Sequence, residues 1–200
     1  MRVVAGTSPD DPDQSTSRLA EILPSSLAPD GRAFCLRELT PEAAGDCDCL
    51  LLQLNLGEFD AWQEECIRRH CYGGGAIVAI GAPSNALPNW PTFAEEVLGG
   101  YCRPPHICKC LDILPAEAAW DHAILSGVEL FRAHVVAGVQ LAADATALLT
   151  ESSGGGAVAW THHYRGGLVF CTVLGHAADF HQPSFVRLIA NAVVWACDEQ

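Results

Sequence analysis

The sequence predicts one α/β domain in which helices cover both faces of a mostly parallel central sheet. The first observation behind this prediction is that short apolar runs of strand length alternate with helix-like stretches along the chain. The second is that two of these runs, Cys49–Leu54 and Ala76–Ile80, are almost continuously apolar, as expected for strands buried on both faces. A chain of 200 residues fits one domain and can bury a sizeable core. We therefore expect a single domain over residues 1–200.

The amino-terminal part of the chain predicts four strands, at residues 2–6, 33–39, 49–54 and 76–80. A helix is expected over residues 59–72 and a shorter one around Leu19–Leu23, whose apolar residues share a helical face. Three glycines, Gly73–Gly75, end the longer helix, because glycine accepts the positive φ that closes a helix. Gly81 follows the strand at 76–80. It therefore begins a loop at the carboxyl end of a central strand, where open α/β sheets place their ligand crevices.

The carboxyl-terminal part predicts a helix over residues 90–98 and then an irregular segment over 101–114. Strands are expected at residues 135–141, 147–150, 157–161 and 168–174, and the last two are joined through a turn at 164–167. A final helix runs from about Pro183, which suits a first helical turn, to Cys197.

The charge of the chain limits its partners. Eleven basic and 24 acidic residues give a formal net charge of −13. A chain with this negative charge is a poor partner for nucleic acids and for anionic membranes, because binding to either requires clustered basic side chains on the protein surface. Neither a membrane-spanning apolar run nor the apolar core of a signal peptide occurs in the sequence, so we expect a cytoplasmic protein.

Ten cysteines are many for such a protein. Several lie in apolar runs, where a free cysteine acts as a small hydrophobe, and we expect reduced thiols. One group resembles a metal site, because thiolates and an imidazole suit zinc. However, the single-residue spacing within this group is unusual for structural zinc, so we expect no metal and no other cofactor. Its members are Cys102, His106, Cys108 and Cys110.

Three segments, taken in order, resemble the trehalose-utilisation (ThuA-like) family, which shares its fold with the class I glutamine amidotransferases. They are Gly73–Gly81 with the following Asn89-Trp90-Pro91, then Asp121–Gly127, and then Val158–His176 with the closing helix. The resemblance covers roughly residues 73–197. It implies a flavodoxin-like three-layer sandwich and a sugar or keto-sugar ligand.

The chain departs from the family pattern at three places. Gly81 stands where the family usually has a histidine, and Leu168 stands where it commonly has an arginine. An acidic patch usually follows the position of His134, where this chain has Val135 and Val136. The departures imply that part of the family's pocket chemistry is missing.

His176 is the expected catalytic residue. It follows a buried strand, and an imidazole at such a position can serve as a general base near neutral pH. The alternative role for His176 is to cap its own loop. Gly81 has no side-chain nucleophile and Ser84 lacks a Gly-x-Ser-x-Gly elbow, so glutamine hydrolysis is not expected. The expected substrate-binding residues are Gly81, Ser84, Asn85, Trp90, His122 and Trp160.

Each binding role has a structural alternative. A helix start is the favoured alternative for His122, and core packing is the commoner fate of a tryptophan. His162 and His163 are adjacent on a strand, so they should face opposite ways and not share a metal.

Two function classes remain open, and a zinc-stabilised domain is a third reading. The chain is either a carbohydrate-metabolism protein that binds or transforms a sugar-like small molecule without a cysteine nucleophile, or a non-catalytic binding or scaffolding member of the same fold. The sequence is compatible with a homodimer, the commonest assembly for such domains.

Overall fold

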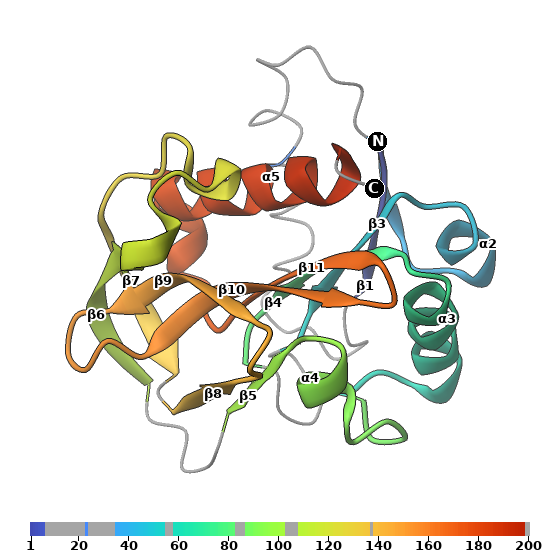
Figure 1. The fold of residues 1–200 in the computed structure, drawn as a ribbon. Coiled ribbons are helices and arrows are strands. Elements are labelled where there is room, and N and C mark those ends of the chain that lie inside the picture. Colours follow the sequence, from blue (N-terminus) through green and yellow to red (C-terminus); the bar gives the residue numbers. More distant parts are fainter. Residues whose placement is uncertain are drawn as a thin grey trace.

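The computed structural model describes residues 1–6, 23, 35–54, 58–82, 87–102, 108–136 and 138–198. A nine-stranded sheet has the order β2-β1-β3-β4-β11-β10-β9-β6-β7, and β5 and β8 form a separate pair (Figure 1). In chain order the strands are β1 (Arg2–Gly6), β2 (Cys35–Glu38), β3 (Cys49–Gln53), β4 (Ala76–Ile80), β5 (Gly100–Cys102), β6 (Cys108–Pro115), β7 (Phe131–Val136), β8 (Val139–Leu141), β9 (Thr146–Glu151), β10 (Ala157–Tyr164) and β11 (Gly167–Thr172).

The centre of the sheet is parallel. β2, β1, β3, β4 and β11 pair in the same direction. Gln53, Ile80 and Thr172 lie opposite one another in a single row across β3, β4 and β11. Parallel strands present their carboxyl ends at one edge, so the loops after these three strands meet there. This confirms the predicted α/β class and the parallel core.

The other half of the sheet is antiparallel. β11, β10, β9, β6 and β7 alternate in direction, so the whole sheet is mixed rather than mostly parallel. The prediction that residues 101–114 are irregular is wrong for the residues that the structure describes, which lie in β5 and β6. β6 is weakly apolar, but it is hydrogen-bonded to β7 on one side and β9 on the other. Pairing in the sheet therefore overrides a weak local pattern.

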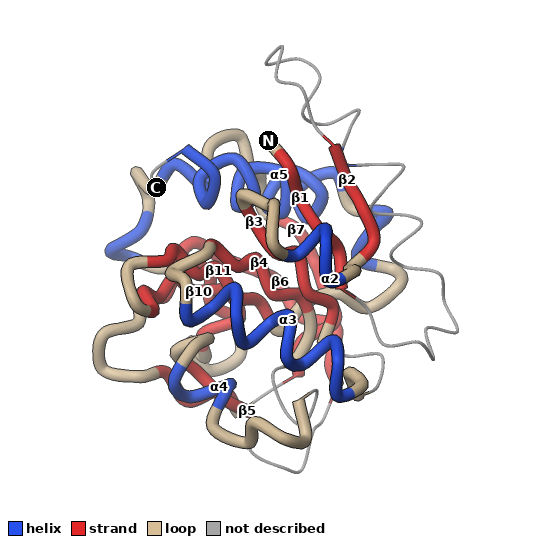
Figure 2. Tube along the Cα trace, turned by 90° about the vertical axis from the view of Figure 1, so that its right-hand side faces the viewer, coloured by secondary structure: helices blue, strands red, loops and turns tan. Residues whose placement is uncertain are grey.

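The helices form the outer layers. They are α2 (Pro41–Ala44), α3 (Ala61–Tyr72), α4 (Phe93–Glu96) and α5 (Pro183–Asp198), with short 3-10 turns η2 (Glu117–Ala119), η3 (Ala123–Leu125) and η4 (Asp179–His181). α5 packs along one face of the sheet, and α3 lies on the other (Figure 2). The helix predicted over 90–98 is limited to α4. Within the described residues, no helix is long and apolar enough to cross a membrane.

The start of α3 is fixed by Asp60. Its carboxylate accepts hydrogen bonds from the backbone N–H groups of Trp62 and Gln63, and the Gln63 side chain accepts one from the N–H of Asp60. Such a capping box satisfies N–H groups that have no partner within the helix. We expect Asp60→Ala to lower the free energy of unfolding by about 1 kcal/mol, measured by urea denaturation. Asp60→Asn keeps an accepting oxygen and should cost much less; equal losses would contradict the capping role.

Candidate acid–base site

The loop after β11 places His176 at the carboxyl edge of the parallel strands. Gly175 has φ +123°, a conformation that residues with a side chain rarely adopt. A Cβ at Gly175 would lie 2.5 Å from Cγ2 of Ile80 and 3.6 Å from the backbone nitrogen of Gly81. The backbone N–H of Gly81, in turn, donates to the carbonyl of Thr172. The start of the loop after β4 is therefore hydrogen-bonded to the end of β11, and Gly175 in the loop after β11 packs closely against Ile80.

A buried carboxylate organises this loop. The Asp179 side chain is 2% exposed. Its Oδ2 accepts hydrogen bonds from the backbone N–H groups of Gly175 (3.1 Å) and His176 (3.0 Å). Its Oδ1 accepts a hydrogen bond from the backbone N–H of His134 at 3.1 Å and lies 3.2 Å from Nδ1 of the same residue. One carboxylate thus joins the loop after β11 to strand β7.

The contact with Asp179 fixes the protonation pattern of His134. A carboxylate that already accepts three backbone hydrogen bonds acts as the acceptor, so Nδ1 of His134 carries the proton that it donates. Nε2 of the neutral ring is then the unprotonated nitrogen, which can accept a proton. The carboxylate orients His134 as a base, in the way that a third group orients the base of a catalytic triad.

His176 has the opposite pattern. Its Nδ1 accepts a hydrogen bond from the backbone N–H of Ala178 at 3.2 Å, so the proton of the neutral ring is on Nε2. The rings of His134 and His176 are stacked, with centroids 4.1 Å apart and planes at 30°. His176 is exposed and His134 is partly exposed, so both rings are accessible from solvent. The pair presents one proton acceptor and one proton donor side by side.

The sequence did not identify His134 or Asp179 as site residues. Along the chain, His134 stands out only because no acidic patch follows it. The carboxylate beside it comes from 45 positions further along the chain, on η4. The signal that could have found Asp179 is its spacing: an acidic residue three positions after His176 can turn back to bind the N–H groups of its own loop.

The two tryptophans expected to bind substrate are packed inside the protein. Trp160 is fully buried, and its Nε1–H donates to the carbonyl of Leu98 at 2.6 Å. Trp90 is 5% exposed, and its ring lies 5.6 Å from that of Tyr72, the last residue of α3. The end of α3 lies near the start of β4, so the Trp90 ring lies toward the amino ends of the strands, away from Gly81. Both therefore adopt the core role that was the alternative.

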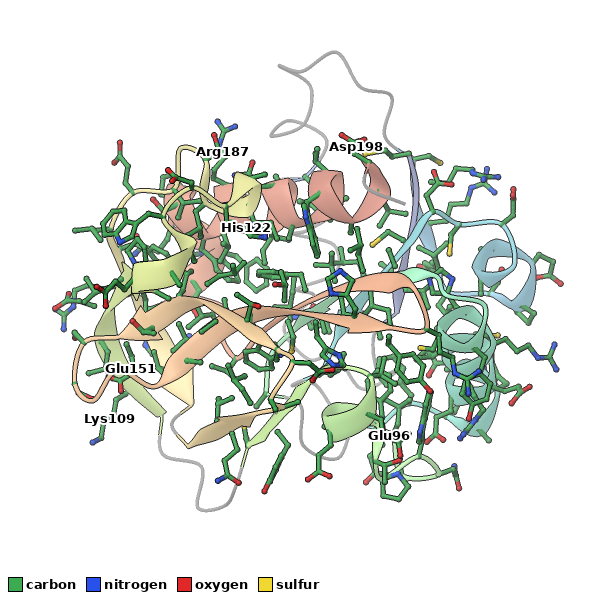
Figure 3. All side chains as sticks on the ribbon, in the orientation of Figure 1. Glu96, Lys109, His122, Glu151, Arg187 and Asp198 are labelled. Atoms are coloured by element: carbon green, nitrogen blue, oxygen red, sulfur yellow. The ribbon has the colours of Figure 1, made fainter. Side chains whose placement is uncertain are left out.

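His122 lies beside α5 (Figure 3). Its Nδ1 accepts a hydrogen bond from the N–H of Ile124, so it caps η3, and its ring is 5.6 Å from that of Trp195. Trp195 is twelve residues beyond Pro183, about 18 Å along the axis of α5 at the helical rise. His122 is therefore far from the His176 loop, which precedes Pro183. Ser84 and Asn85 lie outside the described residues.

The remaining candidates for metal binding stay apart. His162 is buried and its Nδ1 lies 2.9 Å from the carbonyl oxygen of Val97, whereas His163 is exposed, which confirms that the two face opposite ways. Cys102 is buried and Cys110 is exposed; His106 and the side chain of Cys108 lie outside the described part of the chain. Among described residues, no three His, Cys, Asp or Glu side chains are grouped to hold a metal ion.

Comparison with known families gives one match over most of the chain. The family model described as ThuA, trehalose utilisation, matches residues 38–196. No curated protein matches the chain.

Several solved structures share the fold. A protein described as ThuA-like from Bacteroides uniformis superposes with a TM-score of 0.71 at 14% identity, covering 99% of this chain and 91% of its own. A cytoplasmic protein of Salmonella typhimurium gives 0.69 at 14% identity, covering 98% and 99%. The glutaminase domain of Trypanosoma brucei CTPS, solved with bound acivicin, gives 0.55 at 9% identity, covering 97% and 94%. The last of these links the fold to the class I glutamine amidotransferases.

Proposed function

Because the chain belongs to the ThuA family, named for trehalose utilisation, we propose that it transforms a sugar or keto-sugar by proton transfer at His176 and His134. The observation that carries the proposal is the opposite hydrogen bonding of Nδ1 in the two stacked rings, one facing an acceptor and the other a donor. The base is held by a buried carboxylate, and the acid is held by a backbone N–H. Two imidazoles arranged in this way suit the removal of a proton beside a carbonyl group.

For a keto-sugar, the proton that moves has a defined path. Nε2 of His134 removes a proton from the carbon next to the carbonyl, which gives an enediolate and an imidazolium at His134. The Nε2–H of His176 donates a hydrogen bond to the carbonyl oxygen and stabilises the negative charge that develops there. Asp179 stabilises the imidazolium formed at His134. No covalent intermediate is required, and we expect no glutaminase activity, because Gly81 at the bend after β4 has no nucleophilic atom.

The remaining features of the proposal follow from charge and from the relatives. A net charge of −13 favours a neutral, sugar-like small molecule over nucleic acid or a membrane surface. Location in the cytoplasm is supported by the Salmonella proteins of the same fold that are named as cytoplasmic. Gly81 and Asn85 remain proposed ligand contacts, together with Ser84, because their loop follows β4 at this edge.

A non-catalytic binding protein is the second candidate. It is favoured by Gly81 and Leu168, which stand where the family usually has a histidine and an arginine. Leu168 is 6% exposed and contributes to the core. Such a protein would bind a sugar at this edge without turning it over.

The test compares purified variants for turnover of 3-keto-glycosides. We expect His176→Ala and His134→Ala each to lower kcat by about 10²-fold, because the second removes the base and the first removes the hydrogen-bond donor to the carbonyl oxygen. His163→Ala, an exposed histidine on β10, is the control and should leave kcat unchanged.

Thermal-shift titration with the same compounds separates the two classes only when it is combined with the turnover measurement, because both classes can bind a sugar. Wild-type turnover that survives His176→Ala would contradict the catalytic role. Saturable binding with no turnover of any keto-glycoside would favour the binding protein.

A further inference from the structure

A cavity lies at the opposite edge of the sheet from His176. Its volume is about 370 Å³, and it is bounded by α2, the last turn of α3 and the glycine turn before β4. The lining residues that matter here are Cys47, Cys66, Arg69, His70 and Gly75. The cavity shares no residue with the acid–base site, so a role for it is independent of the proposed function.

Cys47 and His70 form a pair within this cavity. Sγ of Cys47 lies 3.6 Å from Nδ1 of His70 and also 3.6 Å from the carbonyl oxygen of Ala44. Nε2 of His70 lies 2.9 Å from the carbonyl oxygen of Ala76. A carbonyl only accepts hydrogen bonds, so Nε2 carries the proton and Nδ1 of the neutral ring is free to accept one from the thiol. Ala76 thus orients the imidazole toward Cys47 as a base.

Gly75 provides the space for this imidazole. A Cβ at Gly75 would lie 2.2 Å from Nε2 of His70 and 2.3 Å from its Cε1. Any side chain at position 75 would therefore displace the ring from both Ala76 and Cys47. The φ of Gly75 is not in the left-handed region, so its backbone conformation does not require a glycine. A glycine is required at this position because a side chain would overlap the His70 ring.

Burial keeps both members of the pair neutral. It raises the pKa of the Cys47 thiol to about 11, with Asp48 acting in the same direction. Burial also lowers the pKa of His70 below its usual value of 6.5. At pH 7 the thiolate is therefore scarce, and a nucleophilic reaction at Cys47 requires a base beside it.

We propose that Cys47 and His70 form a thiol-modification site that takes small disulfides. As Sγ of Cys47 attacks one sulfur of the disulfide, its proton moves to Nδ1 of His70 and the S–S bond of the reagent breaks. The leaving thiolate takes the proton back from the imidazolium. The products are a mixed disulfide at Cys47 and one free thiol; the sulfur of Cys47 is oxidised and the leaving sulfur is reduced.

Other charges also face the pair. Asp46, Asp48 and Arg2, from β1 and the segment before β3, act on Cys47, and so does Cys197 from α5. Arg69 lines the cavity beside His70. A neutral disulfide is therefore the right probe, because its approach does not depend on these charges.

The test measures the rate of mixed-disulfide formation with bis(2-hydroxyethyl) disulfide, residue by residue, using mass spectrometry on the full chain. With His70 as base, we expect the wild-type rate at Cys47 to be nearly constant between about pH 6.5 and 8.5, since neutral imidazole is the dominant form throughout. In His70→Gln the rate should fall by about 10²-fold at pH 7 and then rise about tenfold per pH unit, as thiolate becomes the nucleophile.

Two comparisons make the result specific. Arg69→Gln changes the adjacent residue on α3 and should keep the flat profile. Cys66 lines the same cavity, and its rate should rise with pH in every variant. If circular dichroism shows that His70→Gln does not fold, Gly75→Ala is the second variant, because its Cβ would displace the His70 ring. Two results would overturn the proposal. In the first, the rate at Cys47 in the wild type rises with pH as the rate at Cys66 does. In the second, Cys66 is modified and Cys47 is not.

Discussion

Replacement of Asp179 by asparagine is expected to lower the free energy of unfolding by about 2–5 kcal/mol and to abolish most of the proposed activity. The buried carboxylate accepts two backbone N–H groups at Oδ2, and at Oδ1 a third backbone N–H and the Nδ1–H of His134. An asparagine amide presents an NH₂ group to one of these two sets. The two N–H donors of that set then face the NH₂ group instead of an oxygen, and both lose their hydrogen-bond acceptor.

The effect on catalysis follows from the tautomer. If the amide nitrogen faces His134, the ring is no longer held with its proton on Nδ1, and the base is disoriented. We expect a loss of turnover of about 10²-fold or more, beyond any loss of folded protein. The measurement is urea denaturation followed by kinetics under conditions where the variant is folded.

Asp121→Asn is the matched control for this substitution. Asp121 is exposed in the turn between η2 and η3, and the same change there should shift the stability by no more than about 0.5 kcal/mol. Comparable losses for the two variants would show that the hydrogen bonds of Asp179 contribute little.

Gly175→Ala is expected to destabilise the fold by about 2–6 kcal/mol. The φ of +123° costs about 1–3 kcal/mol for a residue with a side chain. The new Cβ would also lie 2.5 Å from Cγ2 of Ile80, and overpacking of this kind costs about 1–3 kcal/mol. Relief of the overlap would move the N–H groups that bind Asp179, so His176 should lose its position as well.

Gly127→Ala separates the two contributions. Gly127 has φ +67°, and a Cβ added there would have no heavy atom within 4 Å, so alanine meets backbone strain without crowding. We expect a loss of about 1–2 kcal/mol, measured by thermal unfolding. If Gly175→Ala is no more destabilising than Gly127→Ala, the packing of the β11 loop on Ile80 is not required.

Much of the fold could be predicted from local pattern. β1 and β4 have the residue limits that their apolar runs predict, and the hairpin of β10 and β11 follows from its turn. β6 could not be predicted, because its residues alternate weakly and its stability comes from two neighbouring strands. Trp62 shows the same limit: an apolar pattern within the predicted helix favours burial for both Trp62 and Ile67, but only Ile67 is buried and Trp62 remains 43% exposed.

The site was partly predictable for a related reason. His176 and Gly81 follow buried strands, so chain order alone places them at one edge. The pairing of His134 with Asp179 depends on how the antiparallel strands curve back toward η4, and periodicity carries no information about that curvature. Trp90 and Trp160 were misleading because an aromatic residue near a loop has the same local pattern whether it lines a crevice or the core.

The bond between Asp179 and His134 also has a mechanical consequence. β7 is the last strand of the sheet, and three strands separate it from β11. Through one side chain it is nevertheless anchored to the chain segment that leaves β11. The β6–β7 pair cannot fray away from the sheet unless this anchor is released. The terminal strand is therefore coupled to the parallel core, and the two halves of the sheet should open cooperatively.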